Sequence, residues 1–143
     1  MWTHRHEQTT DLTPGQLWPI LADVARWPEI DHNIDWLRID RAPARGVPFT
    51  LKPKGGPRLS FIIGDFEAPH AYSDICRMPL ARMRTLHTLV PHDGGTRIRV
   101  DIEIEGPLAA LWGRFVGRKH AAGLPAQTER FIAGARAQKV DAL

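Results

Sequence analysis

Polar and apolar residues alternate most regularly between positions 96 and 105. Ile98, Val100, Ile102 and Ile104 are apolar, and the residues between them are charged. A period of two is typical of an antiparallel strand with one buried face. Asp93-Gly94, just before this segment, predicts a hairpin turn because both residues tolerate a positive φ. Weaker patterns predict earlier strands at residues 34–40, 47–52, 59–67, 71–77 and 81–90.

A helix is predicted to begin at Thr13. Thr13 and Gln16 have the spacing of a capping box, and Pro14 suits the first helical position. The apolar residues that follow at helical spacing are Leu17, Ile20, Leu21 and Val24. A second helical region over residues 107–139 has an apolar face made of Leu108, Leu111, Trp112, Phe115 and Val116. We expect a kink at Pro125, because proline removes a helical hydrogen bond.

Residues 2–10 are predicted to form a strand with unusual polarity. Neither of its faces is plainly apolar. One face carries Trp2, His4, His6, Gln8 and Thr10.

The order of elements predicts an α+β fold. One strand precedes one or two short helices, six further strands and a long C-terminal helix, so we expect an antiparallel sheet of about seven strands wrapped around that helix. The chain has 143 residues, of which 43% are hydrophobic and 24% charged, as in an ordinary globular protein. We therefore expect residues 1–143 to form a single domain.

Composition also limits the classes of function. Cys76 is the only cysteine, which excludes an intrachain disulfide and favours a reducing compartment, so we expect a cytoplasmic protein. No apolar run approaches the roughly 20 residues of a membrane span, and no signal peptide is visible. The net charge of +3 does not by itself indicate nucleic acid, and we expect neither a metal nor an organic cofactor.

Several local motifs resemble a known family. Residues 17–28 end in Trp27-Pro28 and look like the first helix of the START-like helix-grip superfamily, also called SRPBCC. Residues 91–96 resemble its final hairpin, Gly106-Pro107-Leu108 the start of its gripping helix, and residues 52–57 a loop of a bacterial subgroup. Within this superfamily the chain resembles the polyketide cyclase/dehydrase and lipid-transport group.

The resemblance implies a helix-grip fold with a cavity between the sheet and the C-terminal helix. The first expectation is binding of a hydrophobic, partly oxygenated small molecule, polyketide-like or lipid-like. The alternative is a polyketide aromatase/cyclase or dehydratase that uses histidine acid/base chemistry. A regulatory protein with a vestigial pocket is a third reading, because fold does not settle function.

His87 and His6 are the candidate catalytic residues, because an imidazole exchanges protons near neutral pH. His87 is either a satisfied core histidine or a group that contacts ligand. His4 and His6 are solvated, line a pocket or hold a metal, although no third ligand is obvious. The candidate ligand-binding residues are His4, Gln8, Trp36, Tyr72, Met83, Thr85, Trp112 and Phe115.

Other chemistry-bearing residues leave alternatives open. Asp74 would have a raised pKa inside a pocket, but we expect it to face outward. Trp36 points into the cavity or onto the first helix. Basic residues of the C-terminal helix favour a solvated face, with an acidic carrier protein or an anionic membrane as candidate partners. We expect a monomer or a homodimer and no nucleic-acid partner.

Overall fold

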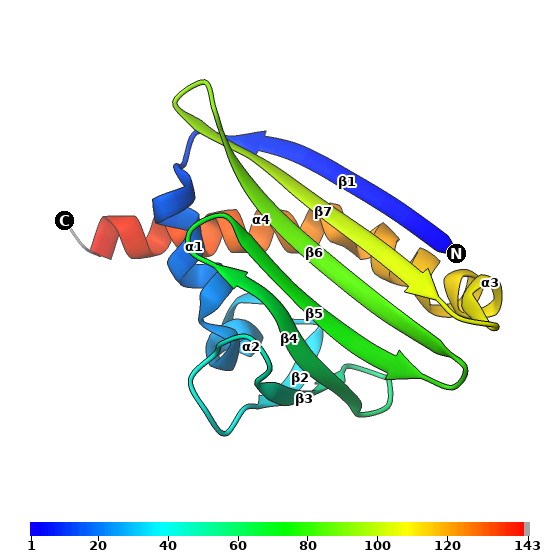
Figure 1. The fold of residues 1–143 in the computed structure, drawn as a ribbon. Helices are drawn as coiled ribbons and strands as arrows, with labels where there is room; N and C mark the ends of the chain where they lie inside the picture. The colour runs from blue at the N-terminus through cyan, green and yellow to red at the C-terminus, as the bar shows by residue number, and fades with distance from the viewer. Residues whose placement is uncertain (142–143) are drawn as a thin grey trace.

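The computed structural model describes the backbone of residues 1–141 and the side chains of residues 1–138. Figure 1 shows a curved sheet that lies across one side of a long C-terminal helix. In chain order, the elements are β1 (Trp2–Thr10), α1 (Pro14–Ala22), the 3-10 turn η1 (Val24–Arg26), α2 (Trp27–Ile30), β2 (Ile34–Arg38), β3 (Pro48–Pro53), β4 (Leu59–Glu67), β5 (Ala71–Met78), β6 (Ala81–His92), β7 (Gly95–Glu105), α3 (Ala109–Trp112), the π-helical turn η2 (Gly113–Gly117) and α4 (Arg118–Asp141).

The strands form one antiparallel sheet in the order β1-β7-β6-β5-β4-β3-β2. The predicted α+β helix-grip architecture is therefore confirmed. Every predicted strand has a counterpart whose ends differ by no more than two residues. No helix among the described residues is both long and apolar enough to cross a membrane.

Two local signals act as the sequence predicts. The backbone N–H of Gln16 donates to Thr13 Oγ1 at 3.3 Å, and Thr13 N–H donates to Gln16 Oε1 at 2.9 Å, so the capping box is complete. Asp93 and Gly94 adopt φ values of 48° and 81° at the tip of the β6–β7 hairpin. Positive φ at both central residues gives a turn whose twist matches the flanking strands.

The C-terminal helical region departs from the prediction. α4 continues through Pro125 without interruption, and the irregular segment is the π turn Gly113–Gly117. Figure 1 shows α3 nearly end-on while α4 runs across the view, so the direction changes around this turn. Gly113 and Gly117 carry no Cβ and lie against the indole of Trp2. Close approach to that ring fixes the chain here, rather than a break at the proline.

The core lies between the sheet and α4. The inward side chains of β7, which include Ile102 and Ile104, are fully buried. Facing them are the buried side chains of α4, at the three-to-four-residue spacing of one helix face: Ala121, Leu124, Thr128, Ile132 and Ala135. This face brings α4 over β5 and β6, where the polar interior residues lie.

Candidate functional site

Polar side chains from β5 and β6 lie on the concave face of the sheet. Tyr72 pairs with His87 across the two strands, and Asp74 pairs with Thr85. Residues at directly opposed positions point to the same face. Tyr72, Asp74 and Thr85 are buried and His87 is half-buried. The strand register thus gathers a phenol, a carboxyl, a hydroxyl and an imidazole beneath the gripping helix.

Asp74 and Tyr72 form the buried hydrogen bond of this group. The hydroxyl of Tyr72 donates to Asp74 Oδ2 at 3.0 Å. Burial raises the pKa of Asp74 to about 7, although the Tyr72 hydrogen bond works in the opposite direction. Burial and the Asp74 charge likewise raise the pKa of the Cys76 thiol to about 11. The carboxyl of Asp74 therefore exchanges its proton near neutral pH.

His87 lacks a hydrogen bond at one ring nitrogen. Its Nδ1 is buried and has no partner among the described residues. Burial, followed by the nearby His120, lowers the pKa of His87 to about 4. The ring is therefore neutral at physiological pH, with one nitrogen donating and the other accepting. A buried polar atom without a partner costs free energy, so this nitrogen is a position where a ligand atom would supply a missing hydrogen bond.

His120 is a member of the group that sequence reasoning missed. Its Nε2 lies 3.2 Å from Thr85 Oγ1, which connects α4 to β6. Burial lowers the pKa of His120 to about 4, with the His4 charge adding to the decrease and Asp31 opposing it. The sequence carried a signal for it, because His120 lies four residues after Val116 and four before Leu124, at the spacing of one apolar helix face.

The histidines of β1 lie at the edge of the sheet, where β7 separates them from β6 and His87. His4 and His6 pair with Ile102 and Val100 of β7, so they share the inner face, but β1 is an edge strand. His6 Nε2 lies 2.8 Å from Gln8 Oε1, and the Gln8 amide donates to Glu129 of α4. His4 is exposed. These residues connect the sheet edge to the helix.

A small gap of about 30 Å³ lies between the sheet, α1 and α4. This volume holds one or two water molecules. Its polar groups are His87, Gln127 and Thr128, and its apolar lining consists of Leu17, Leu21, Leu89, Ile98 and Phe131. Gln127 donates to the buried Asp31 at 3.1 Å, and Arg130 does so at 3.2 Å. Asp31 therefore ties the segment after α2 to the helix that covers the gap.

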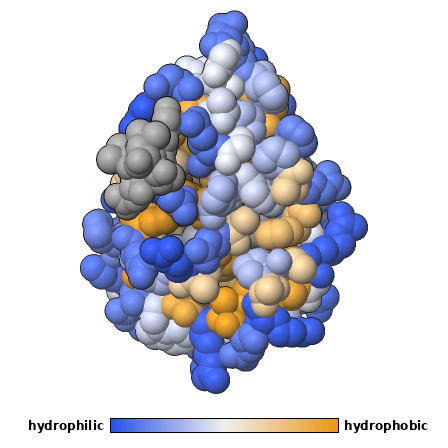
Figure 2. Space-filling model, turned by 90° about the vertical axis from the view of Figure 1, so that its left-hand side faces the viewer, coloured by the Kyte–Doolittle hydropathy of each residue, from blue (hydrophilic) through white to orange (hydrophobic). Residues whose placement is uncertain are grey.

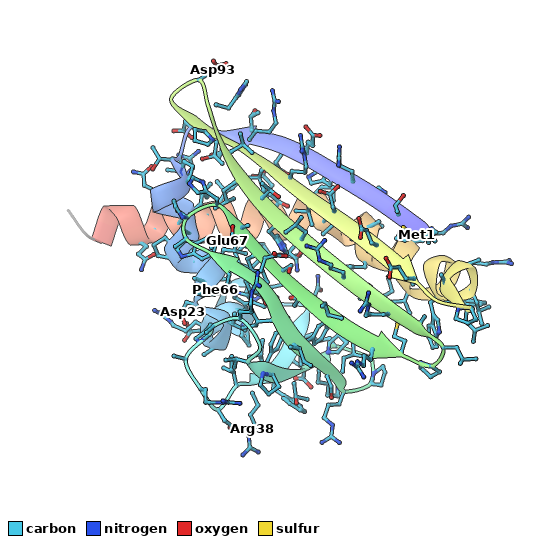
Figure 3. The ribbon with its side chains drawn as sticks, in the orientation of Figure 1. Met1, Asp23, Arg38, Phe66, Glu67 and Asp93 are labelled. Atoms are coloured by element: carbon cyan, nitrogen blue, oxygen red, sulfur yellow. The ribbon has the colours of Figure 1, made fainter. Side chains whose placement is uncertain are left out.

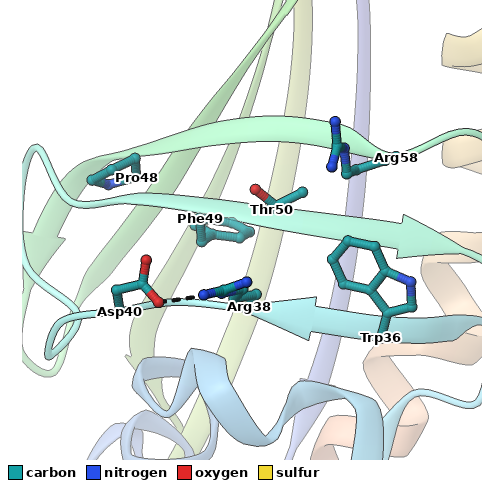
Figure 4. Close-up of a pocket in the computed structure, with 7 residues that line it drawn as sticks. All are labelled: Trp36, Arg38, Asp40, Pro48, Phe49, Thr50 and Arg58. Atoms are coloured by element: carbon teal, nitrogen blue, oxygen red, sulfur yellow. Dashed lines mark hydrogen bonds and ion pairs between the residues drawn. The ribbon is translucent and has the colours of Figure 1, made fainter.

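Three expectations about individual side chains are wrong. Trp36 faces neither the gap nor α1, because β2 places it with Lys52 on the outer face of the sheet. It lines an open groove of about 320 Å³ with Arg38 and Arg58 (Figure 4). Phe115 is 63% exposed, because the buried positions here are Gly113 and Gly117. Asp74 faces inward and is buried, where an outward orientation was expected.

The remaining candidates divide between the interior and the end of the molecule. Met83 and Thr85 are buried on the concave face beside Tyr72 and His87. Trp112 is half-buried, and its indole N–H donates to the carbonyl of Pro79 at 2.8 Å. It therefore packs helix α3 against the β5–β6 turn and does not line the gap.

Comparison with known proteins gives a family match that agrees with the observed fold. A family model described as polyketide cyclase/dehydrase and lipid transport matches residues 1–136. The curated proteins contain no match.

Solved structures share the architecture at low sequence identity. The crystal structure of Ara h 8.0201 has a TM-score of 0.78 and 14% identity, and the match covers 95% of this chain and 98% of the other. Norcoclaurine synthase from Thalictrum flavum, solved with dopamine and hydroxybenzaldehyde, has a TM-score of 0.75 and 12% identity, covering 96% and 87%. A protein of Mesorhizobium loti has a TM-score of 0.66 and 20% identity, covering 98% and 97%. These likenesses show the fold.

Proposed function

Because the chain belongs to the polyketide cyclase/dehydrase and lipid transport family, we propose that it binds a small, mostly apolar molecule between the sheet and α4. The molecule would carry at least one oxygen, which would hydrogen bond to His87. The observation that carries this proposal is the buried Nδ1 of His87, which has no partner, on a residue that lines an otherwise largely apolar gap. Ligand sites commonly combine apolar walls with a few polar groups that fix orientation.

The neutral state of His87 suits this role. A protonated imidazole would be costly in an apolar site, and the lowered pKa of about 4 keeps the ring uncharged at neutral pH. A neutral ring can donate to a ligand carbonyl or accept from a ligand hydroxyl, depending on its tautomer. The expected ligand is therefore an uncharged ketone, alcohol or phenol with an apolar body.

Such a ligand needs more room than the gap of about 30 Å³ provides. α4 would have to move away from the sheet, and the helix has a weak point for this in its first third. Pro125 has no N–H, so one helical hydrogen bond is missing there. Gly123, two residues earlier, has no atom within 4 Å of where a Cβ would lie. The contacts of Asp31 with Gln127 and Arg130 would then hold the helix closed over the ligand.

Native mass spectrometry of freshly purified protein tests the proposal. We expect a stoichiometric adduct that organic extraction releases and that His87→Leu reduces at least tenfold. His92→Leu is the matched control, because His92 lies on the exposed hairpin and contacts Asp93. His87→Gln should retain part of the adduct because glutamine also hydrogen bonds. An adduct of unchanged abundance in His87→Leu would contradict the proposal.

A second function is supported by a different residue. Asp74 is buried, touches the Tyr72 hydroxyl and has its pKa raised to about 7. A general acid or base works best when its pKa is close to the operating pH. For a cyclase or dehydratase reaction, Asp74 is therefore better suited than His87 to exchange a proton, while His87 and Tyr72 would orient the substrate.

The enzymatic proposal is tested with a β-ketoacyl thioester as the substrate. We expect kcat/KM to change around pH 7 in the wild type, and Asp74→Asn to lower kcat about 10²-fold or more and to abolish this pH dependence. Asp65→Asn is the control, because Asp65 is a carboxyl paired with Arg84 and Ser73 away from the gap. If wild-type protein carries an extractable ligand but does not turn over the thioester, the result would favour ligand binding without catalysis.

A further inference from the structure

Exposed apolar side chains gather at one end of the molecule. Leu111 and Phe115 are 46% and 63% exposed, Leu80 is 65% exposed and Met1 is 78% exposed. Only three other large hydrophobic side chains in the described part of the chain are exposed: Trp36, Ile62 and Val90. We call Leu80, Leu111 and Phe115, with Met1 beside them, the apolar end. Isolated exposed apolar residues are ordinary, but a cluster marks an interaction site.

Contacts between three segments bring the parts of the chain that carry these side chains to one end of the molecule. The Trp112 indole of α3 donates to the carbonyl of Pro79 in the β5–β6 turn, and Leu108 N–H donates to the carbonyl of Leu80 at 3.1 Å. Trp2 of β1 lies against the π turn of residues 113–117. Figure 1 shows the N-terminus, α3 and the β5–β6 turn at the same end, and Figure 3 shows Met1 beside α3.

The apolar end is bordered by basic side chains. Arg114, Arg118 and Lys119 are exposed, and the Arg114 guanidinium lies 5.9 Å from the Phe115 ring centre. The sequence has no acidic residue between Glu105 and Glu129. The strand ends that flank the β5–β6 turn add Arg77 and Arg82, of which Arg82 is paired with Glu105.

The backbone of the turn presents Leu80 to solvent under strain. Leu80 has a φ of 54°, in the left-handed region that bulky residues rarely occupy. Stability alone would favour glycine or asparagine at this position. Residues held in such conformations occur most often where function requires them. The conformation thus adds a separate reason to regard the exposed leucine as functional.

From these observations we propose that the apolar end docks onto an anionic lipid surface. Apolar side chains would enter the boundary between headgroups and acyl chains, and the arginines and lysine would meet the lipid phosphates. Figure 2 shows that the opposite end, which carries the C-terminus, interleaves hydrophobic side chains with hydrophilic ones. The proposal goes beyond ligand binding in the interior and does not depend on it.

Charge argues against the alternative that a second copy covers the apolar end. A symmetric dimer would bring the same patch together twice, and so would place Arg114, Arg118 and Lys119 of each copy near those of the other. Like charges brought together at an interface disfavour association. No carboxylate of the α3–π segment is present to offset this repulsion. An anionic surface supplies the missing negative charge.

Vesicle flotation tests the proposal. Wild-type protein should float with vesicles of phosphatidylcholine and phosphatidylglycerol in equal amounts, and much less with phosphatidylcholine alone. Phe115→Ser should lower the partition coefficient about tenfold, because the variant loses about half of the free energy that full burial of a phenylalanine side chain contributes. Arg114→Glu should lower only the preference for the anionic vesicles. Ile62→Ser is the matched control, because Ile62 is 43% exposed on the outer face of the sheet.

Four outcomes of these measurements would overturn the proposal. Wild-type protein that floats with neither vesicle has no lipid-docking end. An equal effect of Ile62→Ser and Phe115→Ser would mean that general hydrophobicity drives the binding. A wild-type dimer that Phe115→Ser converts to a monomer would assign the end to a second copy. Capture of an acidic carrier protein without vesicle binding would assign it to that partner. His87→Leu should bind vesicles like wild type, which separates this proposal from ligand binding.

Discussion

Leu80 is exposed and has a strained backbone conformation, and this strain leads to a prediction about stability. Its φ of 54° brings the Cβ close to the carbonyl oxygen, which costs about 1–2 kcal/mol for an L-residue. Leu80→Gly should therefore raise the free energy of unfolding by about 1 kcal/mol, although it removes an apolar side chain, because that side chain is already in solvent. Urea unfolding measures the change.

The control for Leu80→Gly is Leu111→Gly. Leu111 is an exposed leucine within a helical segment that has no positive φ, so glycine should destabilise the protein there by about 1 kcal/mol. Changes of opposite sign would support strain at Leu80. A loss of stability in Leu80→Gly as large as in Leu111→Gly would show that the side chain packs usefully where it is.

Asp74 shows why single residues of the site were hard to place from the sequence. Its strand has Tyr72, Asp74 and Cys76 on one face, and Ser73, Ile75 and Arg77 on the other. Each face mixes polar and apolar residues, so alternation alone could not decide which is buried. The structure buries Ser73 as well as Asp74. The decisive information is the pairing of β5 with β4 and β6, which is not local.

At the scale of elements, the strands were predictable, but the buried face of the C-terminal helical region was not. β7 pairs along its length and has one apolar face, so a period of two identified it. The C-terminal helix was expected to bury Leu111 and Phe115. It instead buries Gly113 and Gly117 against Trp2, a residue more than 100 positions earlier. A glycine has no apolar signal, so pattern analysis overlooks a close contact that depends on it.

This contact predicts the effect of filling the glycine positions. A Cβ on Gly117 would lie 2.6 Å from Trp2 Cζ3, and one on Gly113 would be closer still to that ring. Gly117→Ala should therefore lower the free energy of unfolding by about 1–2 kcal/mol, since overpacking outweighs the gain in helix propensity. Thermal unfolding followed by circular dichroism measures it.

Gly123→Ala is the matched control within the same helical region. Nothing lies within 4 Å of a Cβ at Gly123, so alanine should stabilise the helix there by about 1 kcal/mol. The double change Gly117→Ala and Trp2→Leu should restore part of the stability lost in Gly117→Ala. If alanine stabilises both glycine positions equally, Trp2 does not hold the π turn.

At the scale of the whole molecule, three interior groups set the pH dependence of stability. In the folded chain the pKa of Asp74 is raised from 3.8 to about 7, so it keeps a proton between about pH 4 and 7 that the unfolded chain releases. Its contribution falls as the pH rises through that window. The pKa values of His87 and His120 are lowered from 6.5 to about 4. The unfolded chain therefore takes up two protons below pH 6.5 that the folded chain does not, and this stability is lost on acidification.

The balance of these protons predicts that stability reaches its maximum near pH 7. Below that pH the two histidines outweigh the one carboxyl, and above it all three groups are largely deprotonated in both the folded and the unfolded chain. Urea midpoints measured from pH 4.5 to 8, a range set by these pKa values, should rise to about pH 7 and then level off. His87→Gln should nearly flatten the acidic limb, because one histidine and one carboxyl then cancel. The control His92→Gln, on the β6–β7 hairpin, should leave the limb unchanged. A wild-type protein more stable at pH 5 than at pH 6.5 would show that the histidines are not held neutral beneath α4.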